Sequence, residues 1–208
     1  MKILVVGGSG MIGSRIVTEA ANRGHQVVAG SRHPEKISAG DNVKAVQIDA
    51  NDAQSIAGAA ADVDAIVMSV SPRSGGDPLQ EAAQVSEAAM SAAKSTGKRL
   101  FYVGGAGSLV LPDGTPVTDI LPDEIKPEAL AMRAVRDKLQ QSDLDWTVLC
   151  PPGDIQPGEK RGQYRLGTTE LMSDQDGKSA ISAEDFADAV VNELETPAHA
   201  KAQFTLAY

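Results

Sequence analysis

The sequence predicts an α/β protein with a doubly wound parallel sheet, and three observations lead to this prediction. Short apolar runs of strand length alternate with segments of helical periodicity along most of the chain. These runs are continuously apolar, which is typical of parallel strands with helices on both faces. No internal repeat or linker divides the 208 residues, so one domain spanning 1–208 is expected.

The expected elements follow from these runs in chain order. The first strand precedes a helix that has Met11, Ile12, Ile16 and Ala20 along one side, the spacing of a buried stripe. Pro127 suits the first turn of a later helix, where its missing N–H has no partner. Strands are expected at residues 2–6, 26–30, 43–49, 64–70, 99–103 and 145–151, and further helices at 53–60, about 78–96 and 127–141.

The C-terminal region is a small extension with a different composition. Residues 151–180 are rich in glycine and polar side chains, which predicts a loop region on the substrate side. Tyr164 and Arg165 lie in it and are candidates to close over a substrate, because long loops at this edge often act as lids. Ser182 then begins a helix with a Ser-x-x-Asp capping pattern, and a last strand is expected at 202–208.

Composition limits the kinds of partner. The formal net charge is −9 and no run of lysine and arginine appears, so neither nucleic acid nor a membrane surface is expected as a partner. Cys150 is the only cysteine, which excludes an internal disulfide. The stretch "MKILVVGG" is too short and too glycine-interrupted for a signal peptide, so a cytoplasmic location is expected. The oligomeric state is left open, a homodimer included.

A glycine cluster follows the first strand and opens the first helix. Gly7, Gly8, Ser9, Gly10 and Gly13 fit both Gly-x-Gly-x-x-Gly and Gly-x-x-Gly-x-x-Gly. Glycines there allow a tight turn and the close approach of a pyrophosphate, which the helix N-terminus then binds. Together with Met11 and Ile12, these residues predict the dinucleotide-binding loop of a Rossmann-like fold.

The end of the second strand points to the type of dinucleotide. Sites for NAD(H) place an acidic residue there to hold the ribose 2′-hydroxyl. This chain has Ser31 and Arg32 instead, with no acid before Glu35, so NADP(H) is preferred over NAD(H). A solvated surface arginine is the alternative.

Further contacts are expected where the next strands end. Asp49 and Ala50 are candidates for the adenine pocket, although a helix cap from Asn51 or Asp52 explains the same polarity. Ser69 and Val70 lie where the nicotinamide ribose would run.

Several stretches together carry a family resemblance. They are "GGSGMIG", "DAND", "GGAGSL", "DWTVLCPP", "PGEKRGQYRLG" and "SAISAEDFADAVVNELETPAH". With them the whole chain resembles the atypical short-chain dehydrogenase/reductases, within the NAD(P)H-binding group of NADH-flavin reductase-like and biliverdin reductase type B-like proteins. The resemblance implies that Pro151 packs near the nicotinamide, with a simple change of chain direction as the alternative. Gly104, after the fifth strand, is a further candidate for binding the cofactor.

The catalytic pattern of most short-chain dehydrogenases does not carry over. These enzymes use a serine after the fifth strand and a Tyr-x-x-x-Lys on the next helix, where tyrosine protonates the carbonyl. Here the helix has Ala134 four residues before Lys138, and Gly104, Gly105 and Ala106 replace the serine. Ser108 is a weak catalytic candidate, with a turn serine as the alternative.

These differences lead to the functional prediction. Glycines at the substrate floor suggest an open, flat pocket, and hydride transfer to a conjugated ring needs little positioned acid. We therefore expect an NADPH-dependent reductase whose substrate is a flavin or a similar small molecule. A non-catalytic NADP(H) redox sensor is the main alternative, and a sugar-nucleotide epimerase is a weaker one. No metal is expected, because His25, His33 and His199 fit no ligand spacing.

Overall fold

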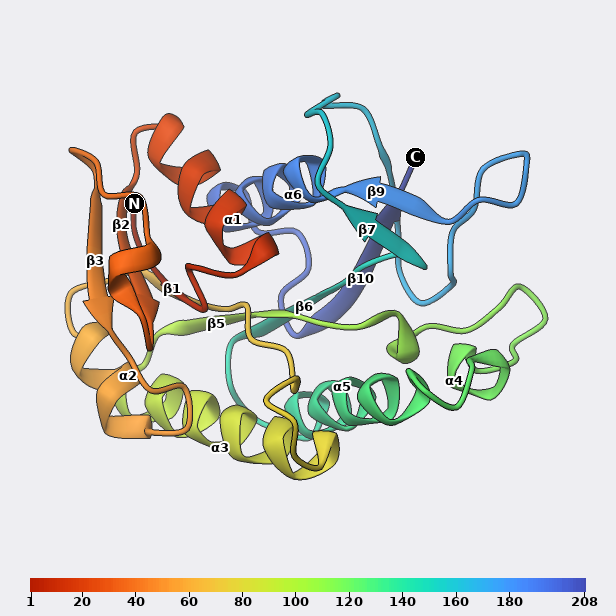
Figure 1. Ribbon diagram of the computed structural model, residues 1–208, viewed down its shortest axis with the longest axis horizontal. Coiled ribbons are helices and arrows are strands. Elements are labelled where there is room, and N and C mark those ends of the chain that lie inside the picture. The colour runs from red at the N-terminus through yellow and green to blue at the C-terminus, as the bar shows by residue number, and fades with distance from the viewer.

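The computed structural model describes residues 1–208, and its centre is an eight-stranded sheet between two helical layers (Figure 1). The strand order is β3-β2-β1-β4-β5-β6-β10-β8. Every neighbouring pair is parallel except β10 and β8. This arrangement confirms the predicted doubly wound α/β fold.

The strand bounds agree closely with the expected ones. The strands are β1 Lys2–Val6, β2 Gln26–Ser31, β3 Val43–Gln47, β4 Ala65–Met68, β5 Arg99–Val103, β6 Trp146–Cys150, β7 Asp154–Gln156, β8 Arg165–Gly167, β9 Ala180–Ser182 and β10 Ala202–Ala207. The α-helices are α1 Met11–Asn22, α2 Ala53–Ala59, α3 Pro78–Thr96, α4 Val117–Ile120, α5 Lys126–Gln140 and α6 Ala183–Glu195; two 3₁₀ turns, η1 Pro34–Lys36 and η2 Ala106–Ser108, complete the list.

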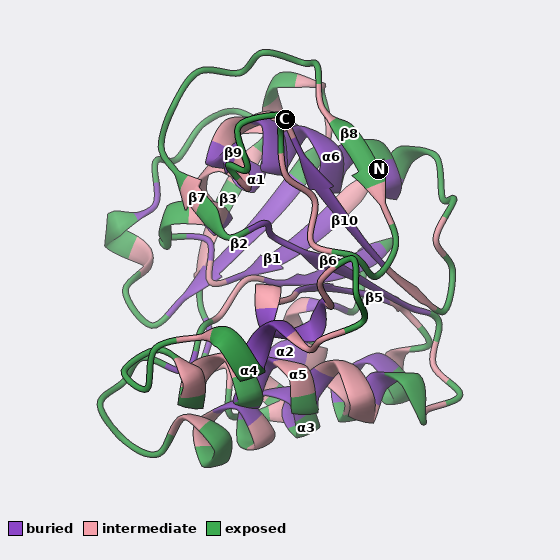
Figure 2. Cartoon of the chain, turned by 90° about the vertical axis from the view of Figure 1, so that its right-hand side faces the viewer, coloured by how far each residue is buried: buried purple, intermediate pink, exposed green.

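The sheet separates two hydrophobic cores, one under each helical layer. Successive side chains of a strand point to opposite faces, so β5 sends Leu100 and Tyr102 to one core and Phe101 and Val103 to the other. Helices α1 and α6 cover one face, and α2, α3 and α5 cover the other (Figures 1 and 2). Burial on both faces explains why the central strands β1, β4, β5 and β6 are mostly apolar.

The structure corrects three details of the sequence prediction. Met11 is 41% exposed, whereas Ile12 packs partly buried against the core and Ile16, Val17 and Ala20 form the buried stripe of α1. Between β5 and α5 lie two short elements that were not among the expected ones, η2 and α4. The expected loop at 151–180 holds β7 and β8, with β7 pairing in parallel with β9 outside the main sheet.

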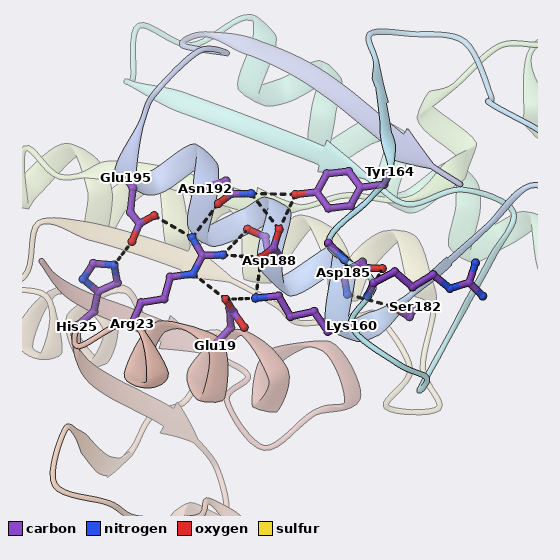
Figure 3. Close-up of polar contacts among 12 residues, drawn as sticks. Glu19, Arg23, His25, Lys160, Tyr164, Ser182, Asp185, Asp188, Asn192 and Glu195 are labelled. Atoms are coloured by element: carbon purple, nitrogen blue, oxygen red, sulfur yellow. Dashed lines mark hydrogen bonds and ion pairs between the residues drawn. The ribbon is translucent and has the colours of Figure 1, made fainter.

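A cluster of charged residues joins α1 to α6 (Figure 3). Arg23, the residue after the last one of α1, donates through Nη2 to Asp188 of α6 at 2.7 Å, through Nη1 to Glu195 at 2.8 Å and through Nε to Glu19 at 2.6 Å. Lys160 lies between Glu19 and Asp188, with its Nζ 2.6 Å and 2.8 Å from their carboxylate oxygens. These contacts also fix residues 157–164, here called the strap, on the outside of the two helices.

The strap covers the acidic first half of α6. Ser182 caps this helix by accepting the N–H of Asp185 at 3.0 Å, which confirms the predicted cap. Asp185 is fully buried and accepts the backbone N–H groups of Arg161 and Gly162 at 3.1 Å and 2.8 Å. The strap therefore satisfies a buried carboxylate that would otherwise be costly.

The charges around Asp188 affect its proton affinity. Burial alone would raise the pKa of Asp188, but hydrogen bonds from Lys160 and Tyr164 and the charge of Arg23 hold it below its usual value. A lowered folded pKa contributes stability above the unfolded pKa, near 4, and this contribution is lost as pH falls through the folded pKa.

Asp188→Asn is expected to reduce the free energy of unfolding by about 2–3 kcal/mol at pH 7, because Arg23 and Lys160 lose a partly buried partner. Urea unfolding at several pH values measures this. The difference from wild type should be largest above about pH 5 and shrink toward pH 3. Asp143→Asn, at an exposed position, is the matched control and should change stability by less than about 0.5 kcal/mol. A constant difference across this pH range would contradict the assignment.

Candidate functional site

The first glycine cluster is a tight turn between β1 and α1. Gly7 has a φ of +88°, and a Cβ atom there would lie 2.1 Å from the carbonyl oxygen of Ser69. A Cβ atom at Gly13 would lie 2.1 Å from the carbonyl oxygen of Gly7. Both glycines are therefore required by the protein's own backbone. By contrast, a Cβ atom at Gly10 would meet only the Gly7 oxygen, at 3.3 Å.

The start of α1 offers unpaired donors at this turn. Gly10 is the N-cap residue, no side chain caps the helix, and its first turn contains no acidic residue. The backbone N–H groups of Met11, Ile12 and Gly13 have no acceptor within the protein. A pyrophosphate fits these donors, because the positive end of the helix dipole adds to their attraction for an anion.

Ser31 and Arg32 lie at the end of β2, beside this turn. The Ser31 hydroxyl is 2.7 Å from that of Ser9 and accepts the backbone N–H of His33 at 3.1 Å. Arg32 is exposed, and its guanidinium makes no hydrogen bond or ion pair. Ser31 thus ties the strand end to the glycine turn, while Arg32 keeps all its donors available for a ligand.

The candidates at the ends of β3 and β4 are also at the carboxyl edge of the sheet. Asp49 accepts the backbone N–H of Asn51 at 2.9 Å, and Asp52 caps α2 by accepting the N–H of Gln54. The sequence left Asn51 and Asp52 open as the cap of this helix, and in the structure the cap is Asp52. Ser69 donates its N–H to Val6 at 2.8 Å, and Ala50, Ser69 and Val70 are all partly exposed.

The second glycine cluster has a different role from the one expected. A Cβ atom would lie 2.7 Å from Val148 Cγ1 at Gly104, 2.9 Å from Met132 Cβ at Gly105 and 2.5 Å from the Ala129 oxygen at Gly107. The space that these glycines leave is therefore filled by β6 and α5. The expected glycine-floored pocket is wrong on this point, because the missing side chains would point into the protein.

The hydroxyl and thiol groups near this edge are buried. Ser108 is 5% exposed, and its Oγ has no hydrogen-bond partner. Burial raises the pKa of Cys150 to about 12. Burial also raises the pKa of Tyr102. None of the three side chains is available to solvent as a proton donor.

The expected substrate lid is attached elsewhere. Tyr164 donates to Asp188 at 2.7 Å and accepts from Asn192 at 2.9 Å, both on α6 (Figure 3). Arg165 donates to the carbonyl oxygens of Ser173 and Tyr208 at 2.7 Å and 2.6 Å. The lid prediction fails for both residues, because each is bound to the protein itself.

Helix α5, which follows the second glycine cluster, contains no tyrosine. Its Lys138 donates to Glu87 of α3 at 2.6 Å, on the outer side of that helical layer. Pro151 and Pro152 are buried directly after β6. No group of three or more His, Cys, Asp or Glu side chains could hold a metal ion, and no helix is long and apolar enough to cross a membrane.

Sequence reasoning missed the residues that anchor the strap and two cations, one in the strap and one near it. Asp185 and Asp188 were placed only within a helix, and Arg161 and Lys178 were not singled out. Arg161 stacks on Tyr208, with the guanidinium carbon 3.9 Å from the ring centroid. These contacts join segments far apart in the chain, so no local pattern indicates them.

The different constraints on Gly10 and Gly13 give a matched pair of variants. Gly13→Ala is expected to destabilise the protein by several kcal/mol, because its methyl group would clash with backbone. Gly10→Ala should change stability by about 1 kcal/mol or less, yet weaken NADPH binding by about 10-fold or more by blocking the pyrophosphate. Thermal unfolding and NADPH fluorescence titration measure the two effects. Undiminished NADPH binding by Gly10→Ala would contradict the assigned loop.

Known proteins resemble this chain over its full length. Among curated proteins, it is 35% identical over 217 residues to the uncharacterized protein YwnB of Bacillus subtilis, which covers 99% of this chain and 98% of the relative. Among solved structures, a "putative exported protein" from Burkholderia pseudomallei is 40% identical, with a TM-score of 0.89 and 100% of both chains covered.

Two further structures share the fold at similar identity. A "putative epimerase" from Bacteroides thetaiotaomicron is 33% identical, with a TM-score of 0.92, covering 100% of this chain and 96% of the other. A "putative NADH-flavin reductase" from Streptococcus pneumoniae is 31% identical, with a TM-score of 0.86 and coverage of 100% and 99%. The protein family described as NAD(P)H-binding matches residues 7–197, and the chain belongs to this family.

Proposed function

We propose that the protein is an NADPH-dependent reductase that transfers hydride to a flavin or another flat, conjugated small molecule. One observation carries this proposal: the carboxyl edge of the sheet has free donors for a dinucleotide but no exposed, positioned proton donor. The amides at the start of α1 have no partners, whereas Tyr102 and Ser108 are buried and Tyr164 is bonded to Asp188. Such a site suits an acceptor that needs no acid from the protein.

In this proposal, each part of the cofactor has its own set of residues. The amides of Met11, Ile12 and Gly13 bind the pyrophosphate, and Arg32 with Ser31 binds the 2′-phosphate. Asp49 and Ala50 lie beside the adenine, Ser69 and Val70 beside the ribose, and Gly104 and Pro151 beside the nicotinamide. When bound, NADPH supplies the hydride, and solvent supplies the proton that completes the reduced acceptor.

The preference for NADPH rests on Arg32. Its guanidinium is exposed and unpaired within the protein, next to the Ser9–Ser31 hydrogen bond. A phosphate dianion binds such a group through paired, charge-assisted hydrogen bonds, whereas a ribose hydroxyl gains little from it. A cytoplasmic location, as predicted from the sequence, belongs to the same proposal.

Similarity to the Streptococcus pneumoniae protein supports a flavin as the acceptor. The epimerase name of the Bacteroides thetaiotaomicron protein suggests a different reaction, which usually relies on an acid and a base at the substrate. Helix α5 has no tyrosine, and its Lys138 is engaged with Glu87. This arrangement favours the reductase.

Arg32→Ala is expected to weaken NADPH binding by about 10- to 100-fold while changing NADH binding by less than about 3-fold, because only NADPH carries the 2′-phosphate. Fluorescence titration with both cofactors measures the ratio. Lys44→Ala, which removes an exposed cation on β3, is the control and should leave both affinities unchanged. Equal losses for NADPH and NADH in Arg32→Ala would refute the preference.

Turnover separates the reductase from the redox sensor. NADPH oxidation should be followed with FMN, FAD, riboflavin and quinones, each against the rate without protein. We expect at least one flavin to be reduced well above the uncatalysed rate. Tight NADPH binding without turnover on any acceptor would instead indicate a sensor.

A further inference from the structure

A polar hollow of about 390 Å³ lies between the strap, the β7–β9 pair and Tyr208. The exposed sides of β7 and β9 line it, since Asp154 and Gln156 face it while Ile155 packs into the core. β7 begins soon after Pro151, so the chain passes directly from the proposed nicotinamide position into this hollow.

Arg161 is held at the hollow by contacts that leave its donors free. Its guanidinium carbon lies 3.9 Å from the centroid of the Tyr208 ring, and it forms no hydrogen bond or ion pair. The Tyr208 hydroxyl donates to buried Asp185 at 2.7 Å and accepts the N–H of Ser182 at 3.1 Å. Stacking on an anchored ring therefore orients the guanidinium in advance.

Unpaired guanidinium groups are rare in this protein. The other arginines donate to carboxylates, carbonyls or hydroxyls, and Arg32 and Arg161 alone have no such partner. Arg32 is the group assigned to the 2′-phosphate. Lys178, which lines the hollow with Arg161, also forms no ion pair. Two free cations at one hollow are typical of a site for a phosphate or carboxylate.

The same hollow contains acceptors, and these restrict the ligand further. Asp174 accepts the N–H groups of Asp176 and Lys178 at 3.0 Å and 2.8 Å, so it serves mainly to close its own turn. Glu159 has no partner, and Asp154 accepts only from Gln156 at 3.3 Å. A bare anion would be repelled by these carboxylates. A ligand that carries hydroxyl donors beside its anionic group satisfies both kinds of residue.

We propose that this hollow binds the phosphorylated polyol arm of the flavin acceptor, so that the protein prefers FMN to riboflavin. Arg161 and Lys178 bind the phosphate, and Asp154 and Glu159 accept from the ribityl hydroxyls. The inference rests on the proposed function, because it assumes that the flavin ring lies at the carboxyl edge near Pro151.

Binding of FMN, riboflavin and lumiflavin, followed by quenching of flavin fluorescence in the presence of NADP⁺, tests the inference without requiring turnover. FMN should bind about 10- to 100-fold more tightly than riboflavin, and lumiflavin, which lacks the polyol, should bind more weakly still. Arg161→Gln should remove most of the FMN advantage and leave riboflavin binding unchanged. Lys178→Gln should also reduce the FMN advantage, by a smaller factor. This variant leaves the stacking of Arg161 on Tyr208 intact.

Lys94→Gln, an exposed cation on α3, is the matched control and should change neither affinity. Equal binding of FMN and riboflavin by the wild-type protein would overturn the inference, as would equal losses for both in Arg161→Gln and Lys178→Gln. If the protein binds ribose 5-phosphate but does not prefer FMN to riboflavin, the hollow is a site for a separate sugar phosphate. That result would also overturn the inference. Selective FMN binding without NADPH oxidation would refute the reductase while keeping the site.

Discussion

The structure of the binding edge depends on a backbone contact between the first glycine turn and the loop after β4. β1 lies in the middle of the sheet, with β2 on one side and β4 on the other. The order of the strands therefore reverses at β1, and ligands of such sheets bind in the crevice at this point. The carbonyl oxygens of Gly7 and Ser69 occupy the space where side chains at Gly13 and Gly7 would stand. Only glycine at these positions lets α1 begin directly over the crevice, with its free amides facing a ligand.

The contact between α1, α6 and the strap is held by different interactions. Helix α6 has two buried carboxylates on the face that meets α1 and the strap. Asp185 accepts backbone hydrogen bonds from the strap, and Asp188 is paired with Arg23 and Lys160. Pairing of this kind is costly to break, because a buried charge without its partner is strongly destabilising. The strap is therefore fixed by the same residues that join α1 to α6, which makes the wall of the hollow a rigid part of the fold.

Local patterns predicted most of the fold, and their failures have physical causes. Continuous apolar runs indicated every strand of the parallel sheet, because burial on both faces leaves that pattern. Met11 was misplaced because periodicity alone does not tell at which residue an apolar stripe stops contacting the core. The glycines at 104, 105 and 107 were misread because the sequence does not say toward which neighbours a missing side chain would point.

Only the cofactor-binding part of the candidate site could be predicted from the sequence. The glycine turn and Arg32 lie close together in the sequence and carry a known spacing, whereas Tyr164 and Arg161 gain their roles from partners on α6 and at Tyr208. Hydrogen bonds between distant segments leave no periodic signal, and a tyrosine in a loop is equally consistent with a lid and with an anchor. The short strands β7 to β9 were missed for a similar reason, because each is too short to show an alternation.

The net negative charge of the protein makes its two unpaired arginines selective for anionic ligands. With a net charge of −9, most of the surface repels a polyanion, and the cations of the α1–α6 cluster are neutralised by neighbouring carboxylates. Arg32 and Arg161 are exceptions at the carboxyl side of the sheet, one at each proposed anionic group. A phosphorylated cofactor and a phosphorylated acceptor would thus be attracted locally and repelled elsewhere, which disfavours binding of either in the wrong place. The two arginines are therefore selective because the surface around them is acidic. Each binds the phosphate end of its ligand, the cofactor or the acceptor, and so leaves the nicotinamide and the acceptor ring free to meet.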